Sequence, residues 1–122
     1  MKKIRKLIDQ LSVLSDEMNL QILSLLKLHG NLYVCNLEEV LGCPQSSLSR
    51  HLSSLRKADL IDSTKEGKFR LYHLIQTDHY IGMIIEEAIK ALGYDEKTPV
   101  SKEKIEKIYT NCKRRNCDQN DR

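Results

Sequence analysis

The sequence predicts a mainly α-helical fold with one small β-hairpin. Three observations support this. Leucine and isoleucine recur every three or four residues along most of the 122-residue chain, which is the periodicity of amphipathic helices. Aromatic and apolar residues alternate with polar ones at period two in a single segment, residues 69–74. Glycine or proline separates many of these segments, as expected where helices and turns end.

The helices are predicted in the following order. Residues 3–14 carry an apolar stripe on an otherwise charged segment and form the first helix. Ser15 is the predicted N-cap of the second helix, and Gly30 ends it. After a short extended bridge at residues 32–34, Asn36 is the predicted cap of a third, short helix.

A serine-rich helix follows the turn at Cys43 and Pro44. Pro44 is predicted at the first helical position, where its missing N–H costs nothing, so that Cys43 becomes the N-cap residue. The stripe of Leu48, Leu52 and Leu55 is expected to be buried. The opposite face carries short hydroxyls, an amide and a guanidinium, which suit close approach to phosphates and base edges. A short helix, a turn and this polar helix make a helix-turn-helix unit.

The β-hairpin is predicted from residues 60–65 and 69–74, with a turn around Gly67. A basic hairpin directly after the polar helix makes the unit a winged helix-turn-helix, whose wing can reach neighbouring phosphates. A fifth helix is predicted to begin near Asp78 and to end at Gly93.

The chain divides into a winged helix-turn-helix domain, residues 1–95, and a C-terminal extension, residues 96–122. The extension is predicted to hold a weaker sixth helix and a frayed, cysteine-containing tail. The first and fifth helices both have wide apolar faces. We expect a second copy of the chain to bury these faces across a two-fold axis, which predicts a homodimer.

Composition excludes several classes of protein. The net charge of +3 is only mildly basic, and the lysines and arginines cluster in separate segments. No apolar run is long enough to span a bilayer, so we expect no membrane association and a cytoplasmic protein. Four sparse cysteines do not suggest a disulfide-stapled secreted scaffold. No catalytic triad, paired-carboxylate site or phosphate-binding glycine loop is recognisable, so we predict that the protein is not an enzyme.

Five segments carry a resemblance to a known family. They read LSDEMNLQIL at 14–23, LYVCNL at 32–37, LGCPQSSLSRHL at 41–52, LRKADLI at 55–61 and EGK at 66–68, the last followed by Tyr72. In this order the sequence resembles the ArsR/SmtB family of bacterial winged-helix repressors, over roughly residues 10–92. The resemblance implies a homodimer built through the first and fifth helices. It also implies binding to inverted repeats in double-stranded DNA, and release when an inducer, often a metal or metalloid ion, binds.

The expected DNA contacts lie on the polar face of the serine-rich helix and on the hairpin. They are Gln45, Ser46, Ser47, Ser49, Arg50, His51, Ser54, Lys65, Lys68 and Arg70. Gln45 suits adenine, and Arg50 suits guanine or a phosphate. Pro44 departs from the family, which commonly has a serine cap there. This departure places Cys43 at a helix N-terminus, where a thiol becomes more reactive.

The family's inducer motifs are incomplete in this chain. Arsenic-sensing members carry Cys-Val-Cys-Asp-Leu, and residues 33–37 keep only the second cysteine, Cys35. Trivalent arsenic prefers three thiolates, so this segment cannot supply the whole site. The zinc-sensing alternative on the fifth helix requires a histidine where this chain has Tyr80.

Three interpretations of the cysteines remain open. In the first, Cys112 and Cys117, alone or with Cys35 or Cys43, bind As(III), Sb(III) or another thiophilic ion as inducer, with no obligatory cofactor. In the second, the thiols respond to oxidants or sulfur species, as in a repressor without metal input. In the third, the cysteines are structural or incidental. An alternative from another class is a winged-helix module that binds partner proteins instead of DNA.

Overall fold

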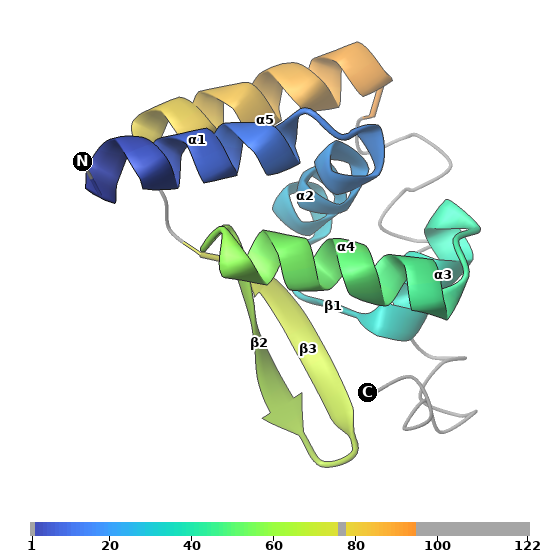
Figure 1. Cartoon of the computed structure of the whole chain (residues 1–122). Helices are drawn as coiled ribbons and strands as arrows, with labels where there is room; N and C mark the ends of the chain where they lie inside the picture. Colours follow the sequence, from blue (N-terminus) through green and yellow to red (C-terminus); the bar gives the residue numbers. More distant parts are fainter. Residues whose placement is uncertain (1, 76–77, 95–122) are drawn as a thin grey trace.

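The computed structural model describes residues 2–75 and 78–94 (Figure 1). In chain order the elements are α1 (Lys2–Leu14), α2 (Glu17–His29), β1 (Leu32–Tyr33), α3 (Val34–Leu41), α4 (Gln45–Lys57), β2 (Ile61–Glu66), β3 (Phe69–Leu74) and α5 (His79–Leu92). This is the predicted winged helix-turn-helix order with β1 added. The predicted sixth helix and the extension 96–122 lie outside the described residues. Within the described part of the chain, no helix has the length and apolar character needed to cross a membrane.

Helix α2 forms the centre of the core. Residues 22–26 are all buried, so this part of the helix has no solvent-exposed face. It contacts α1, α4, α5 and β3. In Figure 1, α1 and α5 lie at one end of the molecule, the β2–β3 wing projects from the other, and α2 lies between α5 and α4. The elements of the helix-turn-helix unit are therefore positioned by packing on one buried helix.

The sheet has three antiparallel strands in the order β1-β3-β2. β2 and β3 form the predicted hairpin, in register from Ile61 opposite Leu74 to Glu66 opposite Phe69. Gly67 in the turn has a φ of 63°, a left-handed conformation that glycine adopts without strain. The segment expected to be an extended bridge pairs with the far side of β3, which gives the wing a third strand at its base.

Helix α2 begins one residue later than predicted. Asp16, not Ser15, is its N-cap, and the Asp16 Oδ1 accepts a hydrogen bond of 3.1 Å from the backbone N–H of Asn19. The Ser15 hydroxyl instead donates to the Ser12 carbonyl at the end of α1, at 2.6 Å. A carboxylate at this position also complements the positive end of the helix dipole.

Helix α3 begins two residues earlier than the predicted cap at Asn36. Its N-cap is Tyr33, whose backbone N–H donates to the Asn36 Oδ1 at 2.9 Å. Asn36 therefore closes the cap from inside the first turn and is fully buried. The helix ends at Gly42, in the left-handed conformation that commonly follows a helix.

The predicted start of α4 was wrong by one residue. Pro44 is the N-cap and the helix begins at Gln45. Cys43 therefore precedes the cap and does not occupy it. Its side chain is buried in the main core, with the Sγ 3.6 Å from the Pro44 carbonyl oxygen. The expectation of a reactive thiol at the entrance of the DNA-reading helix is not supported by this position.

Helix α4 ends in a tight reversal that leads directly into β2. The N–H of Leu60 donates to the Leu55 carbonyl and the N–H of Asp59 to the Arg56 carbonyl, each at 3.0 Å. This is the hydrogen-bond pattern of a Schellman motif. Asp59 takes the left-handed position with a φ of 61°, a conformation that aspartate tolerates better than most residues.

Helix α5 has the predicted ends, with Asp78 as N-cap and Gly93 as C-cap. Tyr94 follows and packs against the main core. Burial, with a smaller contribution from the carboxylate of Glu17, raises the pKa of the Tyr94 phenol.

A buried carboxamide links three helices. Gln10 of α1 is only 5% exposed. Its Nε2 donates to the carbonyl of Ala58 at the end of α4, at 3.0 Å, and its Oε1 accepts from the Tyr80 hydroxyl of α5, at 2.9 Å. One side chain therefore ties α1 and α5 to the C-terminus of the helix-turn-helix.

We expect Gln10→Met to lower the free energy of unfolding by about 1–3 kcal/mol, because methionine fills a similar volume but leaves two polar groups unpaired. Tyr80→Phe, which removes only the second bond, should cost less, about 1 kcal/mol. Urea unfolding at one fixed protein concentration measures both variants. Equal stability of Gln10→Met and the parent protein would contradict a structural role for this link.

Candidate nucleic-acid interface

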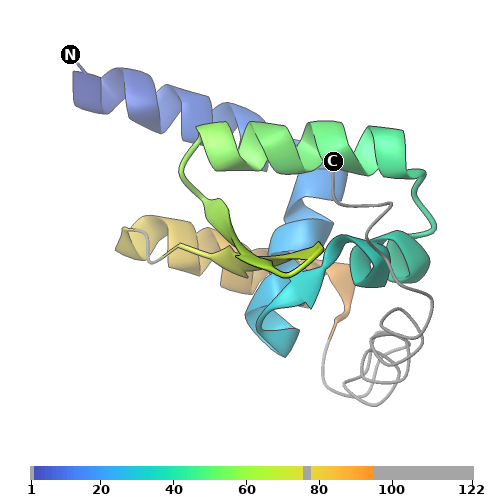
Figure 2. The ribbon, with the colours of Figure 1, turned by 90° about the horizontal axis from the view of Figure 1, so that it is seen from below.

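Helix α4 is held by its predicted leucine stripe. Leu48, Leu52 and Leu55 are at most 2% exposed. They pack in the main core, and α4 contacts α2, α3 and β2. Because the apolar stripe is anchored on several elements, the opposite, polar face of α4 is turned away from the core. Figure 2 shows α4 along one edge of the molecule.

The residues predicted to meet DNA on α4 divide by exposure. Ser46, Arg50 and Ser54 are exposed, whereas Gln45, Ser47 and Ser49 are half-buried. The sequence interpretation did not include Arg56 at the C-terminal end of this helix. Its guanidinium is exposed and lies 3.8 Å from the Asp62 carboxylate.

His51 does not extend outward like its neighbours. Its side chain is 25% exposed, with Nδ1 3.8 Å from the Asp16 carboxylate. The same Nδ1 lies 2.9 Å from the Asn19 Oδ1. The imidazole therefore bridges α4 and α2, and one edge of the ring is committed to the protein.

The basic residues of the wing have different environments. Lys65 and Lys68 are exposed near the tip, whereas Arg70 is half-buried and its Nη1 donates to the Ser63 hydroxyl at 3.0 Å. Glu66, the acidic residue at the tip, accepts a hydrogen bond of 2.8 Å from the Tyr33 hydroxyl. The tip of the wing thus combines two exposed lysines with a carboxylate that a protein hydroxyl engages.

A small apolar cluster supports the wing. Tyr33 and Cys35 are buried and pack with Phe69 and Leu71 of β3. The rings of Tyr33 and Phe69 have centroids 5.5 Å apart, within the range of a favourable aromatic pair. Cys35 is disulfide-bonded, and Cys43 is a free thiol.

The described residues do not assemble a metal site. They contain no group of three or more histidine, cysteine or acidic side chains placed to hold an ion. Tyr80, which stands where the zinc-sensing pattern needs a histidine, uses its hydroxyl to bond Gln10. The predicted ligands Cys112 and Cys117 lie outside the described residues.

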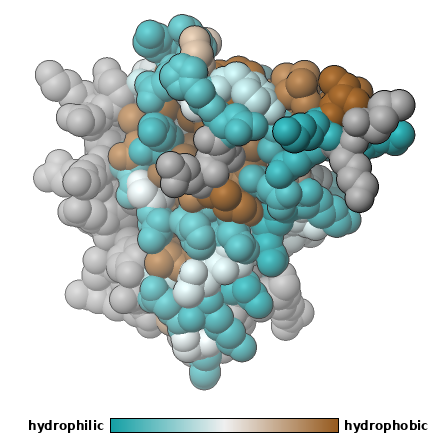
Figure 3. All heavy atoms as spheres, turned by 90° about the vertical axis from the view of Figure 1, so that its left-hand side faces the viewer, coloured by the Kyte–Doolittle hydropathy of each residue, from teal (hydrophilic) through white to brown (hydrophobic). Residues whose placement is uncertain are grey.

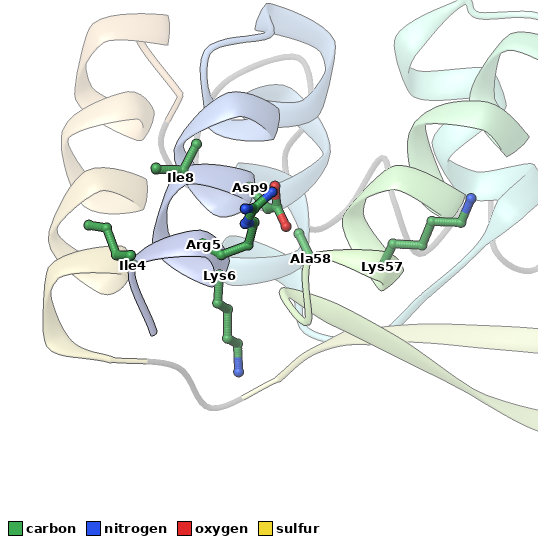
Figure 4. Close-up of a pocket in the computed structure, with 7 residues that line it drawn as sticks. All are labelled: Ile4, Arg5, Lys6, Ile8, Asp9, Lys57 and Ala58. Atoms are coloured by element: carbon green, nitrogen blue, oxygen red, sulfur yellow. The ribbon is translucent and has the colours of Figure 1, made fainter. Parts of the chain in front are cut away.

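A hollow of about 610 Å³ lies between α1 and the end of α4 (Figure 4). It is lined by Ile4, Arg5, Lys6, Ile8, Asp9, Lys57 and Ala58. Lys6 also pairs with Asp59 at 3.5 Å. The lining is apolar and charged and contains no thiol or imidazole, so this hollow does not suit a thiophilic ion.

Comparisons with known proteins agree with the fold. Residues 16–63 match the family described as bacterial regulatory protein, arsR family. The chain is 35% identical over 106 residues to the arsenical resistance operon repressor of Escherichia coli K12, covering 86% of this chain and 83% of that protein. It is also 33% identical over 75 residues to an HTH-type transcriptional regulator of Methanocaldococcus jannaschii, covering 62% of this chain and 84% of that protein.

Among solved structures, HlyU from Vibrio cholerae is similar, with a TM-score of 0.65 and 31% identity over 77% of this chain and 99% of that one. A structure of HlyU from Vibrio vulnificus matches with a TM-score of 0.58 and 30% identity, over 75% of this chain and 91% of that one. The polar face of α4, the basic wing and these relationships give one conclusion. The chain belongs to the arsR family and is a DNA-binding transcriptional regulator, not an enzyme.

Proposed function

We propose that the protein is a homodimeric repressor that binds an inverted-repeat operator and releases it when its cysteines receive a signal. The observation that carries the proposal is the fixed outward face of α4, with Ser46, Arg50 and Ser54 exposed over a fully buried leucine stripe. Such a face can enter a major groove, while the lysines of the wing contact phosphates beside it.

The dimer is supported by apolar side chains that one chain leaves in water. Ile4, Ile8 and Leu11 on α1 are 50%, 56% and 45% exposed, and Met83 on α5 is 55% exposed. Figure 3 shows hydrophobic surface along the upper part of the molecule, where α1 and α5 lie in Figure 1. A second copy, related by a two-fold axis, would cover these groups. Two copies of α4 would then meet half-sites about 34 Å apart, which requires an inverted repeat.

The first candidate inducer is As(III) or a similar thiophilic ion. It is supported by the similarity to the arsenical resistance operon repressor of Escherichia coli and to the cadmium resistance transcriptional regulatory protein CadC of Listeria innocua, which is 36% identical over 62 residues, about half of each chain. The ligands would come from Cys112 and Cys117, joined by Cys43 or by Cys35, because As(III) prefers three thiolates. Cys35 could serve only after a reductant has cleaved its disulfide. No cofactor is obligatory in this proposal.

The second candidate signal is oxidation, which the disulfide at Cys35 favours. Joining two thiols into a disulfide releases two electrons and two protons, and a peroxide-class oxidant would accept them to form water. Cys35 packs with Tyr33 and with Phe69 and Leu71 of β3. A change of redox state there would alter the packing at the base of the wing.

We expect Ile8→Glu to convert the dimer into monomers, because a carboxylate would be buried in the proposed interface. Operator affinity should fall at least tenfold, since each half-site would bind alone. Light scattering gives the mass in solution and a gel shift gives the affinity. Asn31→Glu adds the same charge at an exposed loop position and should change neither. A dimeric Ile8→Glu variant with parental affinity would reject this interface.

We expect the double variant Lys65→Gln, Lys68→Gln to lower the slope of log K against log salt by about 2, because each lost phosphate contact removes about 0.9. The loss of binding affinity should be similar on operator and unrelated DNA, since phosphates carry no sequence information. Lys90→Gln, on α5, is the matched control. An unchanged salt slope in the double variant would show that the wing does not contact phosphates.

The signal can be identified by titrating the operator complex with arsenite, with zinc and with hydrogen peroxide. If As(III) is the inducer, arsenite should release the parent protein from DNA and leave the Cys112→Ser, Cys117→Ser variant bound. If oxidation is the signal, peroxide should release the parent protein from DNA, whereas the Cys35→Ser variant should stay bound. Cys43→Ser controls for the loss of a core thiol. Failure of every agent to release the parent protein would reject both candidates.

A further inference from the structure

Asn19 is a buried polar side chain at the contact between α2 and the DNA-reading helix. It is 4% exposed. Its Nδ2 lies 2.8 Å from the carbonyl oxygen of Val13, and its Oδ1 lies 2.9 Å from the Nδ1 of His51 on α4. Both ends of this carboxamide are therefore engaged, one with the end of α1 and the other with a residue of the reading helix.

The Val13 carbonyl decides how the carboxamide is oriented. A carbonyl oxygen only accepts hydrogen bonds, so the NH₂ group of Asn19 must face it. The opposite orientation would place two acceptors 2.8 Å apart. The Asn19 oxygen therefore faces His51. Because that oxygen has no proton to give, the hydrogen of the 2.9 Å contact must sit on the Nδ1 of His51.

This proton assignment fixes what the rest of the ring can do. A neutral imidazole with hydrogen on Nδ1 carries a lone pair, and no hydrogen, on Nε2. His51 lies on the same side of α4 as Ser47 and Ser54, four residues before it and three after it, which is the spacing of one helical face. With Nδ1 turned to α2 and a quarter of the side chain exposed, Nε2 is the nitrogen left for this face.

We propose that Asn19 is a specificity-determining positioning residue for DNA reading. Through His51 it makes α4 present a hydrogen-bond acceptor to the major groove. The matching groups there are the amino groups of cytosine N4 and adenine N6, whereas a phosphate, which only accepts, does not match. The inference rests on the proposed binding of DNA by α4 and adds the class of base edge that His51 reads.

Asp16 is the charged side chain that faces the ring from α2. Its Oδ1 is 3.8 Å from the His51 Nδ1 and already accepts the Asn19 N–H at 3.1 Å. A protonated ring would carry hydrogen on both nitrogens and would select acceptors instead. The experiments are therefore set at one fixed pH of 8, and the ¹⁵N measurement reports whether one or both ring nitrogens carry hydrogen.

The first experiment needs no DNA. Long-range ¹H–¹⁵N NMR of the full chain at pH 8 distinguishes a protonated from an unprotonated ring nitrogen. We expect the His51 signal to show hydrogen on Nδ1 and none on Nε2. In Asn19→Leu, which has a similar volume and no acceptor, the tautomer should become mixed. Hydrogen on Nε2 of the parent protein would overturn the proposal.

The second experiment is a selection from a randomised DNA library, also at pH 8. At one position on one strand of each half-site, the parent protein should prefer cytosine or adenine over guanine or thymine by about tenfold or more. His51→Asn keeps an N–H for Asn19 but has no atom in place of Nε2, and should reduce this preference to less than threefold. Asn19→Leu should do the same. Gln21→Leu makes the same kind of change elsewhere on α2 and should keep the preference.

Two outcomes of the selection would overturn the proposal. One is an unchanged base preference in His51→Asn. The other is a uniform loss of affinity on all sequences with a shallower salt dependence, which indicates a phosphate contact. If Asn19→Leu does not fold, the NMR result on the parent protein and the selection with His51→Asn still test the proposal. If the parent protein selects no DNA at all, the proposed function fails, whereas a failed tautomer prediction overturns the role of Asn19 alone.

Discussion

The enclosure of α2 is the constraint on which the rest of the structure depends. Residues 22–26 are buried without interruption, over more than one helical turn, so α1, α4, α5 and β3 must each take a different side of it. Each fully buried leucine or isoleucine stabilises the fold by about 1.5–3 kcal/mol. Polar groups beside such a helix cannot keep their water, and therefore need partners within the protein. Asn19 and Gln10 satisfy this need with bonds that also fix α4 at two points.

The elements that sequence predicted well are those whose signals are local. The leucine stripe of α4, the glycines that end α2, α3 and α5, and the hairpin all appear within a few neighbouring residues. The predicted N-caps of α2, α3 and α4 were wrong by one to three residues. At α2, Ser15 and Asp16 are equally suitable caps in sequence and only packing selects one. Strand β1 was predicted only as an extended bridge, because its partner in the sheet, Tyr72 opposite Leu32, is far along the chain.

The residues of the predicted interface differ in how far the sequence could indicate their environment. Ser46 and Arg50 are exposed as expected, because the buried stripe on the same helix determines where they point. His51 and Arg70 were expected to face DNA as well, but each has a hydrogen-bond partner on another element. The partner of His51 is 32 residues away. No local pattern encodes such a pairing, so the sequence could identify these residues and could not orient them.

The structure offers two physically different routes from a signal to DNA. Cys35 shares a cluster with the base of the wing, so a chemical change there first affects Tyr33 and Phe69, and with them the lysines at the tip. Gln10 instead joins α1 and α5 to the end of α4. Under the proposed function, wing contacts with phosphates would influence binding to every sequence, whereas the angle of α4 would determine which bases are read. A signal at Cys35 would then lower affinity in general, while a change in the packing of α1 and α5 would alter discrimination between operator and other DNA.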